Sequence, residues 1–251
     1  MNALTFGGIF LGIILISTAI IREGSAVIFL NLNAAFITIG GTVSATFIAY
    51  PFKDVRRLLH VALNAFKKDI YPPGAFIETI LYLSKIYRSG GLKKLETEEE
   101  SLYNRYLRLG VELIVDGYDE RDIHTIMEKE RLFLSLRHES GEMILRTMAR
   151  FAPAFGMAGT LIGLIHMLLM FDNPAGIGRP LAQALVSTFY GILAANLVLL
   201  PLAAKLKTRT DSEIVLMRVI MDGILGIYRK ENPAKLKRHL NSILPPSQRI
   251  E

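Results

Sequence analysis

Four long apolar stretches, arranged as two pairs around a charged segment, constrain this chain more than any other feature. None of the four contains an Asp or a Glu, and they cover residues 3–21, 34–49, 151–171 and 181–204. Each is close to the length of about 20 residues with which a helix crosses the hydrocarbon core of a bilayer. The pattern predicts an all-α polytopic membrane protein with four transmembrane helices.

The lengths of the intervening segments predict the domain organisation. Residues 1–50 and 151–204 are expected to form two transmembrane hairpins, separated by a helical cytoplasmic domain at 51–150 and followed by a basic helical cytoplasmic tail at 205–251. Residues 121–171 contain a single proline, Pro153, so the third span should continue a cytoplasmic helix without interruption. The fourth span should likewise extend past Pro201 into the tail.

Within the domain at 51–150, hydrophobic periodicity and breaker residues predict further helices. We expect an amphipathic helix at 55–66, a second helix at 75–87 that stops at Gly90 and Gly91, and a third at 98–115. Asp119 is expected to cap the helix that follows.

The distribution of basic residues predicts the orientation, because Lys and Arg near the ends of spans are retained in the cytoplasm. Residues 52–149 carry 16 Lys and Arg and residues 205–251 carry 10, whereas each short connection carries one. Both termini and the large domain should therefore be cytoplasmic. The domain also carries 16 acids and the tail five, so the net charge of +6 lies mostly in the tail. We interpret it as membrane-proximal charge, with no nucleic acid as partner.

Several classes of chemistry have no support in the sequence. The chain has no Cys, and its five His show no metal-ligand spacing, so neither a disulfide nor a metal site is predicted. There is no phosphate-binding loop and no nucleophile motif, so we predict no cofactor and no enzymatic activity.

Small and hydroxyl-bearing residues form a stripe on each of the last two spans. On the third span the residues that recur at helical spacing are Pro153, Gly156, Gly159, Thr160 and Gly163. On the fourth span they are Ala184, Thr188, Gly191 and Ala195. Such stripes let helix backbones approach closely in lipid, and the hydroxyls can bond back to their own helix. The alternative is that the hydroxyls line a wet path.

Three sequence runs resemble those of a known family. They are PAFGMAGTLIGL at 153–164, ALVSTFYGILAANLVLLP at 184–201, and GGT at 40–42 with the later Tyr50 and Pro51. The resemblance covers essentially the whole chain and identifies it as similar to the A subunits of the flagellar motor stator, the MotA/PomA family. It implies a multi-pass protein of the bacterial inner membrane, in a homo-oligomeric ring, expected to be a pentamer, around a dimer of MotB/PomB-type B subunits.

The resemblance also implies a division of labour. Since no span here offers a carboxylate, the ion-carrying Asp comes from the B subunit. This chain would supply Thr160 and Thr188 as oxygen ligands, while Pro153 and Pro201 free backbone carbonyls. The transported ion is H⁺ or Na⁺, and the hydroxyl of Ser187 beside Thr188 favours Na⁺.

A second implied site is the contact with the rotor protein FliG. The run RSGGLKKLE at 88–96 places Arg88 and Glu96 at the spacing of the family's rotor-contacting charges, and Glu98 can contribute. The alternative is that these charges only complement helix ends. Two rival functions stay open, an ExbB/TolQ-like energiser of outer-membrane processes and a non-conducting membrane scaffold.

Overall fold

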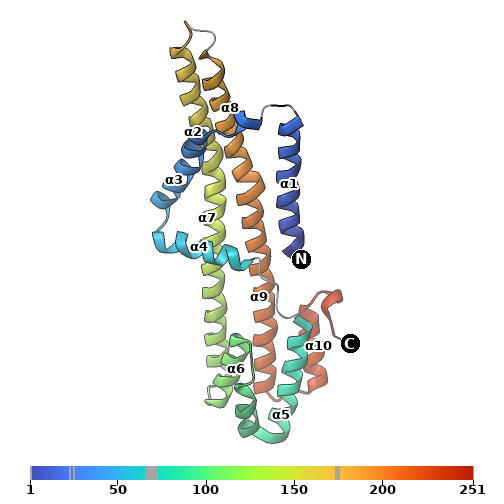
Figure 1. Ribbon diagram of the computed structural model, residues 1–251. Coiled ribbons are helices and arrows are strands. Elements are labelled where there is room, and N and C mark those ends of the chain that lie inside the picture. Colours follow the sequence, from blue (N-terminus) through green and yellow to red (C-terminus); the bar gives the residue numbers. More distant parts are fainter. Residues whose placement is uncertain (1, 23, 25, 66–72, 173–175, 251) are drawn as a thin grey trace. The chain divides into compact units, whose positions relative to one another are not determined.

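The computed structural model describes residues 2–22, 24, 26–65, 73–172 and 176–250, and the secondary structure in this part of the chain is helical throughout (Figure 1). The all-α prediction is confirmed. The chain divides into two compact units, each built from two stretches of sequence. Unit 1 comprises Met1–Lys68 and His138–Thr208, and unit 2 comprises Asp69–Arg137 and Arg209–Glu251.

The first part of unit 1 consists of two helical arms joined by a 3₁₀ turn, followed by a short amphipathic helix. Its elements are α1 (Asn2–Arg22), the 3₁₀ turn η1 (Ala26–Phe29), α2 (Leu32–Ala35), the π-helical η2 (Phe36–Gly40), α3 (Gly41–Ala49) and α4 (Phe52–Ala65). Asn31 starts the second arm, since its side-chain oxygen accepts from the N–H of Ala34 at 3.0 Å. The helix predicted at 55–66 is α4, except that residue 66 lies outside the described residues.

Two long helical runs complete unit 1 and continue into unit 2. α7 (Glu120–Leu169) passes through Pro153 without a break. α8 (Gly178–Leu193), the π-helical η4 (Ala194–Leu199) and α9 (Leu200–Tyr228) follow one another directly. The predicted continuity of the third and fourth spans is thus confirmed. The π turn, which the sequence analysis did not predict, ends two residues before Pro201, and its wide backbone accommodates a residue without an N–H.

Three helical runs in the described part of the chain are long and apolar enough to cross a membrane: Ala26–Ala49, Glu120–Leu169 and Gly178–Tyr228. The apolar part of α1, Phe10–Arg22, is shorter, so the number of four spans stays a prediction. Large apolar side chains on these runs point outward, among them Ile48, Leu161 and Leu185, each more than half exposed. Exposed apolar surface of this kind suits a hydrocarbon environment.

Unit 2 packs five helical elements around one apolar core. They are α5 (Pro73–Glu99), α6 (Arg105–Val115), the beginning of α7, the end of α9 and α10 (Pro233–Ile243), with a 3₁₀ turn, η5 (Pro246–Gln248), after them. The largest fully buried side chains come from α5, α6, α7 and α9 and include Ile77, Ile80, Leu107, Met127, Ile220 and Ile224. Two stretches of sequence far apart along the chain therefore share this core.

α5 is bent at Gly91, which divides it into two arms. Gly91 has φ 70° and ψ −164°, a backbone conformation that residues with a Cβ avoid. The predicted break at Gly90 and Gly91 is therefore confirmed. The single helix predicted at 98–115 was wrong, because α5 ends at Glu99 and α6 begins only at Arg105.

Caps explain where the neighbouring helices begin. The side chain of Asn104 accepts from the N–H groups of Tyr106 at 3.0 Å and Leu107 at 2.9 Å, which starts α6 after an irregular segment at 100–104. The predicted cap at Asp119 is confirmed, since its carboxylate accepts from the N–H of Asp122 at 2.8 Å.

Candidate functional site

Four oxygen atoms of α7 and α8 converge at a pair of threonines. The hydroxyls of Thr160 and Thr188 are hydrogen-bonded to each other. The carbonyl oxygen of Gly156 lies 3.2 Å from the Thr160 hydroxyl and 3.3 Å from the Thr188 hydroxyl. The carbonyl oxygen of Ala184 lies 3.1 Å from the Thr160 hydroxyl. Two hydroxyl hydrogens are shared among these oxygens, so the pair can change its donor and acceptor roles without moving a backbone atom.

Glycines allow the two helices to approach each other at this pair. A Cβ on Gly156 would lie 3.0 Å from the carbonyl oxygen of Ser187, and one on Gly163 would lie 2.7 Å from the Cβ of Ala184. A Cβ on Gly191 would lie 2.5 Å from the carbonyl oxygen of Ala152. The stripes of small residues seen in the sequence therefore face each other across the contact between α7 and α8.

The other members of the two stripes lie at the same contact. Gly159 faces Ser187, because a Cβ there would lie 1.9 Å from the Ser187 hydroxyl. Ala195, in the π turn η4, is buried in a small cluster with Ala149 and Ala152. Pro153 lies against Gly191, since a Cβ on that glycine would lie 3.0 Å from the Cα of the proline. Along α7, Pro153 comes about two helical turns before Thr160.

Ser187 does not join the threonine pair. Its hydroxyl lies 2.9 Å from that of Thr38, and its carbonyl oxygen accepts from the Thr38 hydroxyl at 3.2 Å. Successive residues on a helix point about 100° apart, so Ser187 points toward Thr38 of η2 and Gly159 of α7, whereas Thr188 points toward Thr160. Pro201 is also separate from the pair, since it lies in the first turn of α9, after η4.

Thr38 is a residue that the sequence analysis missed. It belongs to a series of buried threonines, Thr38, Thr42 and Thr46, which recur every four residues on one helical face. Thr42 and Thr46 each donate to the carbonyl four residues earlier, at 2.6 and 2.7 Å. This spacing was visible in the sequence, but the partner of Thr38 on α8 was not.

The charged residues expected to contact the rotor lie on both arms of α5. Arg88 donates to the carbonyl oxygen of Lys230 at 2.8 Å, just after the end of α9. Glu96 is exposed, and Glu98 accepts from the hydroxyl of Tyr82 at 3.3 Å. Arg88 therefore complements a helix C-terminus, as the alternative interpretation required, although that end belongs to α9 and not to its own helix.

Two polar contacts of unit 2 shift the pKa of one of their members. The Glu98 carboxylate raises the pKa of the Tyr82 hydroxyl, and the hydrogen bond from Arg229 lowers the pKa of Glu120. Within the described residues no three His, Cys, Asp or Glu side chains gather as they would to hold a metal ion.

Similarity to known proteins agrees with this arrangement. Residues 98–219 match the MotA/TolQ/ExbB proton channel family. The chain is 36% identical over 241 residues to the uncharacterized protein YtxD of Bacillus subtilis (strain 168), covering 94% of this chain and 88% of that protein. It is 32% identical to Motility protein A of Treponema phagedenis, covering 100% of this chain and 97% of that protein. It is also 31% identical to Chemotaxis protein PomA of Vibrio alginolyticus, with 99% and 98% covered.

Solved structures extend the similarity to the fold. A chain of the C. jejuni MotAB structure superposes with a TM-score of 0.93 at 25% identity, covering 100% of this chain and 99% of that one. A chain of the flagellar MotAB stator complex from Bacillus subtilis superposes with a TM-score of 0.90 at 29% identity, with 97% and 96% covered. The chain therefore belongs to the MotA/TolQ/ExbB proton channel family, among its MotA and PomA members, the A subunits of flagellar stators.

Proposed function

We propose that this protein generates torque as the A subunit of an ion-driven flagellar stator in the bacterial cytoplasmic membrane, with both termini and unit 2 in the cytoplasm. The observation that carries the proposal is the hydroxyl pair of Thr160 and Thr188 between two apolar helical stretches, residues 151–171 and 181–204, that contain no Asp or Glu. Side-chain hydroxyls within a transmembrane stretch are expected where they contact a passing ion or a protonatable group.

The missing acid comes from a B subunit of the MotB/PomB type. An Asp of that subunit, placed beside the threonine pair, binds and releases the ion, and the pair accepts or donates hydrogen bonds in both states. Loading the Asp removes a charge whose burial is costly in a low dielectric, so the helices around it take up a different position. Repeated loading and release turns a ring of A subunits, proposed to be a lipid-embedded pentamer, around a B-subunit dimer.

Torque reaches the rotor through charges of unit 2. Arg88, Glu96 and Glu98 are exposed or partly exposed on the two arms of α5, and we propose that they contact oppositely charged residues of FliG. Individual exposed ion pairs are weak, about 0–1 kcal/mol. Complementary charge nevertheless favours fast and oriented contact between moving parts.

Sodium is the coupling ion in this proposal. A sodium ion requires several oxygen ligands, whereas a proton requires one transferable site. Thr38, Ser187, Thr160 and Thr188 supply hydroxyls on two sides of α8. Swimming of a complemented strain should slow strongly when sodium is replaced by potassium at constant pH, and undiminished speed would assign the proton instead.

The ion path is tested by reconstitution. The A and B subunits together in liposomes should conduct, with flux lost in Thr188→Ala and largely retained in Thr188→Ser, which keeps the hydroxyl. The A subunit alone should be ion-tight, because it lacks the acid. Robust flux through the A subunit alone would contradict the proposed origin of the acid, and unchanged torque in Thr188→Ala would favour a non-conducting scaffold.

A further inference from the structure

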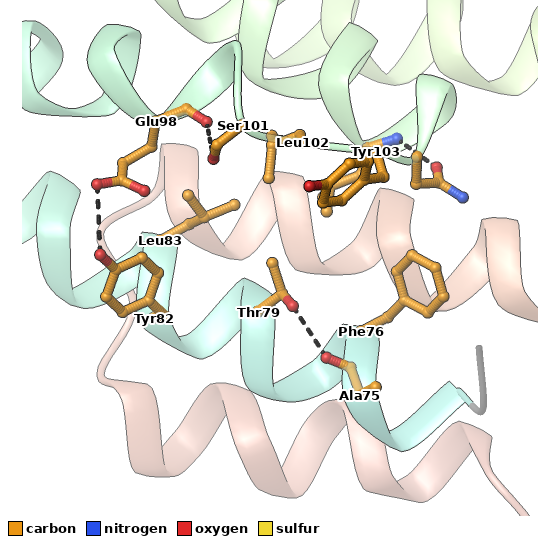
Figure 2. Close-up of a pocket in the computed structure, with 11 residues that line it drawn as sticks. Ala75, Phe76, Thr79, Tyr82, Leu83, Glu98, Ser101, Leu102 and Tyr103 are labelled. Atoms are coloured by element: carbon orange, nitrogen blue, oxygen red, sulfur yellow. Dashed lines mark hydrogen bonds between the residues drawn. The ribbon is translucent and has the colours of Figure 1, made fainter. Parts of the chain in front are cut away.

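Unit 2 contains a pocket between the first arm of α5 and the segment that leads from its second arm into α6 (Figure 2). Its volume is about 220 Å³, several times the roughly 30 Å³ share of one liquid water molecule. Figure 2 shows Leu83 and Thr79 on one side and Leu102 on the other, with Phe76 at one end. The Gly91 bend creates this space, because it brings the second arm of α5 back toward the first.

The pocket is lined mainly by apolar atoms and opens at the surface. Phe76, Leu83 and Leu107 are buried members of the core, so the deep wall is rigid and apolar. Tyr103, another lining residue, is 94% exposed, and Tyr82 is 52% exposed. Exposed tyrosines beside an apolar hollow are typical of protein–protein contact sites, in which aromatic residues are enriched.

A single carboxylate stands at the rim. Glu98 accepts from the Tyr82 hydroxyl at 3.3 Å, and in the part of the chain that the structure describes no Lys, Arg or His lies within ion-pair distance of it. A carboxylate accepts about four hydrogen bonds, so Glu98 retains capacity for a cation. Positions 96 and 100 are also Glu, whereas Glu99 lies 3.5 Å from Arg108 and is already paired.

We infer that this pocket receives a bulky apolar side chain of the rotor protein, from a segment in which a neighbouring Lys or Arg pairs with Glu98. The inference rests on the proposed function and adds an apolar anchor to a contact so far described only by charge. Glu96 and Glu98 both lie on the second arm of α5, and Glu98 lines the pocket, so one partner segment can reach both. Charge orients the encounter, and burial of the apolar side chain lengthens it.

Pocket filling provides the test, with the complete A/B complex in nanodiscs and purified FliG as the probe. Thr79→Leu places a larger side chain in the pocket and removes a hydroxyl that bonds to the carbonyl of Ala75. Thr125→Leu is the matched control, since Thr125 is exposed on α7 and bonds in the same way to the carbonyl of Arg121. Tyr103→Ser is a second variant, whose exposed position leaves folding undisturbed.

We expect Thr79→Leu and Tyr103→Ser each to weaken FliG binding by about tenfold or more, the range of a hot-spot side chain, while Thr125→Leu changes it by less than about twofold. Glu98→Gln should weaken binding and reduce its salt dependence. Wild-type affinity in a folded Thr79→Leu complex together with wild-type affinity in Tyr103→Ser would overturn the inference.

The other outcomes separate the pocket from the stator function. If the two variants change the size of the A-subunit ring and not FliG binding, the pocket is a contact between copies of this chain and the inference is wrong. If the wild-type complex fails to bind FliG, the rotor contact and the inference fail together. If the wild-type complex binds FliG and conducts ions, but Thr79→Leu and Tyr103→Ser leave the FliG affinity unchanged, only the inference fails.

Discussion

The hydroxyl oxygens of Thr38 and Ser187 lie 2.9 Å apart, and neither side chain is exposed. The same threonine lies within bonding distance of the carbonyl of Ser187, which belongs to the peptide that precedes Thr188. Thr38 therefore holds the backbone from which one half of the threonine pair projects. The π-helical η2 therefore contacts the backbone of the candidate ion site directly.

Replacing Thr38 by Val should impair ion coupling without preventing assembly. The variant keeps the shape of the side chain but leaves polar atoms of Ser187 buried and unsatisfied, at a cost of about 1–3 kcal/mol. Motor speed should fall, and its dependence on ion concentration should shift. Thr38→Ser should restore both.

Thr46→Val is the control for this prediction, because Thr46 is equally buried and its hydroxyl donates to the carbonyl of Thr42 on its own helix. Motor speed plotted against ion concentration, measured on tethered cells, separates the two variants. An equal loss of motor speed in Thr38→Val and Thr46→Val would show that the loss of any buried hydroxyl slows the motor, and that the bond to Ser187 has no special role.

Replacing Gly191 by Ala should separate α7 from α8. The added Cβ would lie 2.5 Å from the backbone carbonyl oxygen of Ala152, which cannot turn aside as a side chain does. Overpacking of this kind costs about 1–3 kcal/mol. Gly40→Ala is the matched control, since nothing lies within 4 Å of the added atom.

The measurement for the glycine pair is the midpoint of thermal aggregation of the detergent-solubilised A/B complex. A lower midpoint for Gly191→Ala with an unchanged midpoint for Gly40→Ala is the expected result. A Gly191→Ala complex as stable as wild type would mean that the helices are less closely packed than described.

Replacing Arg88 by Ala should reduce rotor binding more than stability. Its hydrogen bond to the carbonyl of Lys230 is exposed, so its loss should change the free energy of unfolding by only about 0–1 kcal/mol. Arg121→Ala, also in unit 2 and exposed, serves as the control. Paired measurements of FliG affinity and melting temperature decide between the rotor role and the structural one, and a lower melting temperature with normal affinity supports the structural role.

Acid should remove the stabilisation that Glu120 contributes to unit 2. Its carboxylate accepts from Arg229, with one bond of 2.8 Å, and this contact lowers its pKa below the ordinary value of 4.5. A depressed folded-state pKa means that the contribution is complete above pH 4.5 and is lost as the pH falls through the folded-state pKa. Both partners are partly exposed, so salt should weaken the effect.

Melting curves of wild type and Glu120→Gln across this pH range provide the check. The variant should melt at a lower temperature near neutral pH, and the difference should vanish in acid and shrink at high ionic strength. A difference that persists below the folded-state pKa would place the effect of the substitution elsewhere.

Local signals made much of this fold predictable. The lengths of α7 and of the α8–α9 run followed from uninterrupted helix formers, and the cap at Asp119 and the break at Gly90 and Gly91 followed from residues with special backbone preferences. Each of these features depends on residues within a few positions of one another.

Features that depend on distant residues were not predictable in the same way. Residues 98–115 were predicted as one helix, yet Leu102 packs against the core of unit 2 and Asn104 caps a new helix, so the chain turns there. The orientation of Ser187 away from Thr188 follows from helix geometry, but its partner Thr38 lies 149 residues away. Thr160 and Thr188 were each singled out from the sequence as expected oxygen ligands, but their hydrogen bond to each other was not predicted.

The shared core of unit 2 sets an order of events during synthesis. Ile80 of α5 packs closely against Gly223 of α9, since a Cβ on that glycine would lie 2.7 Å from the Ile80 side chain. The ribosome nevertheless translates α9 long after α5. The apolar faces of α5 and α6 therefore stay exposed until residues 209–250, which complete the core, have left the ribosome. A chain released before that point would contain all its apolar stretches, but the core residues of α5 and α6 would be exposed to the chaperones and proteases of the cell.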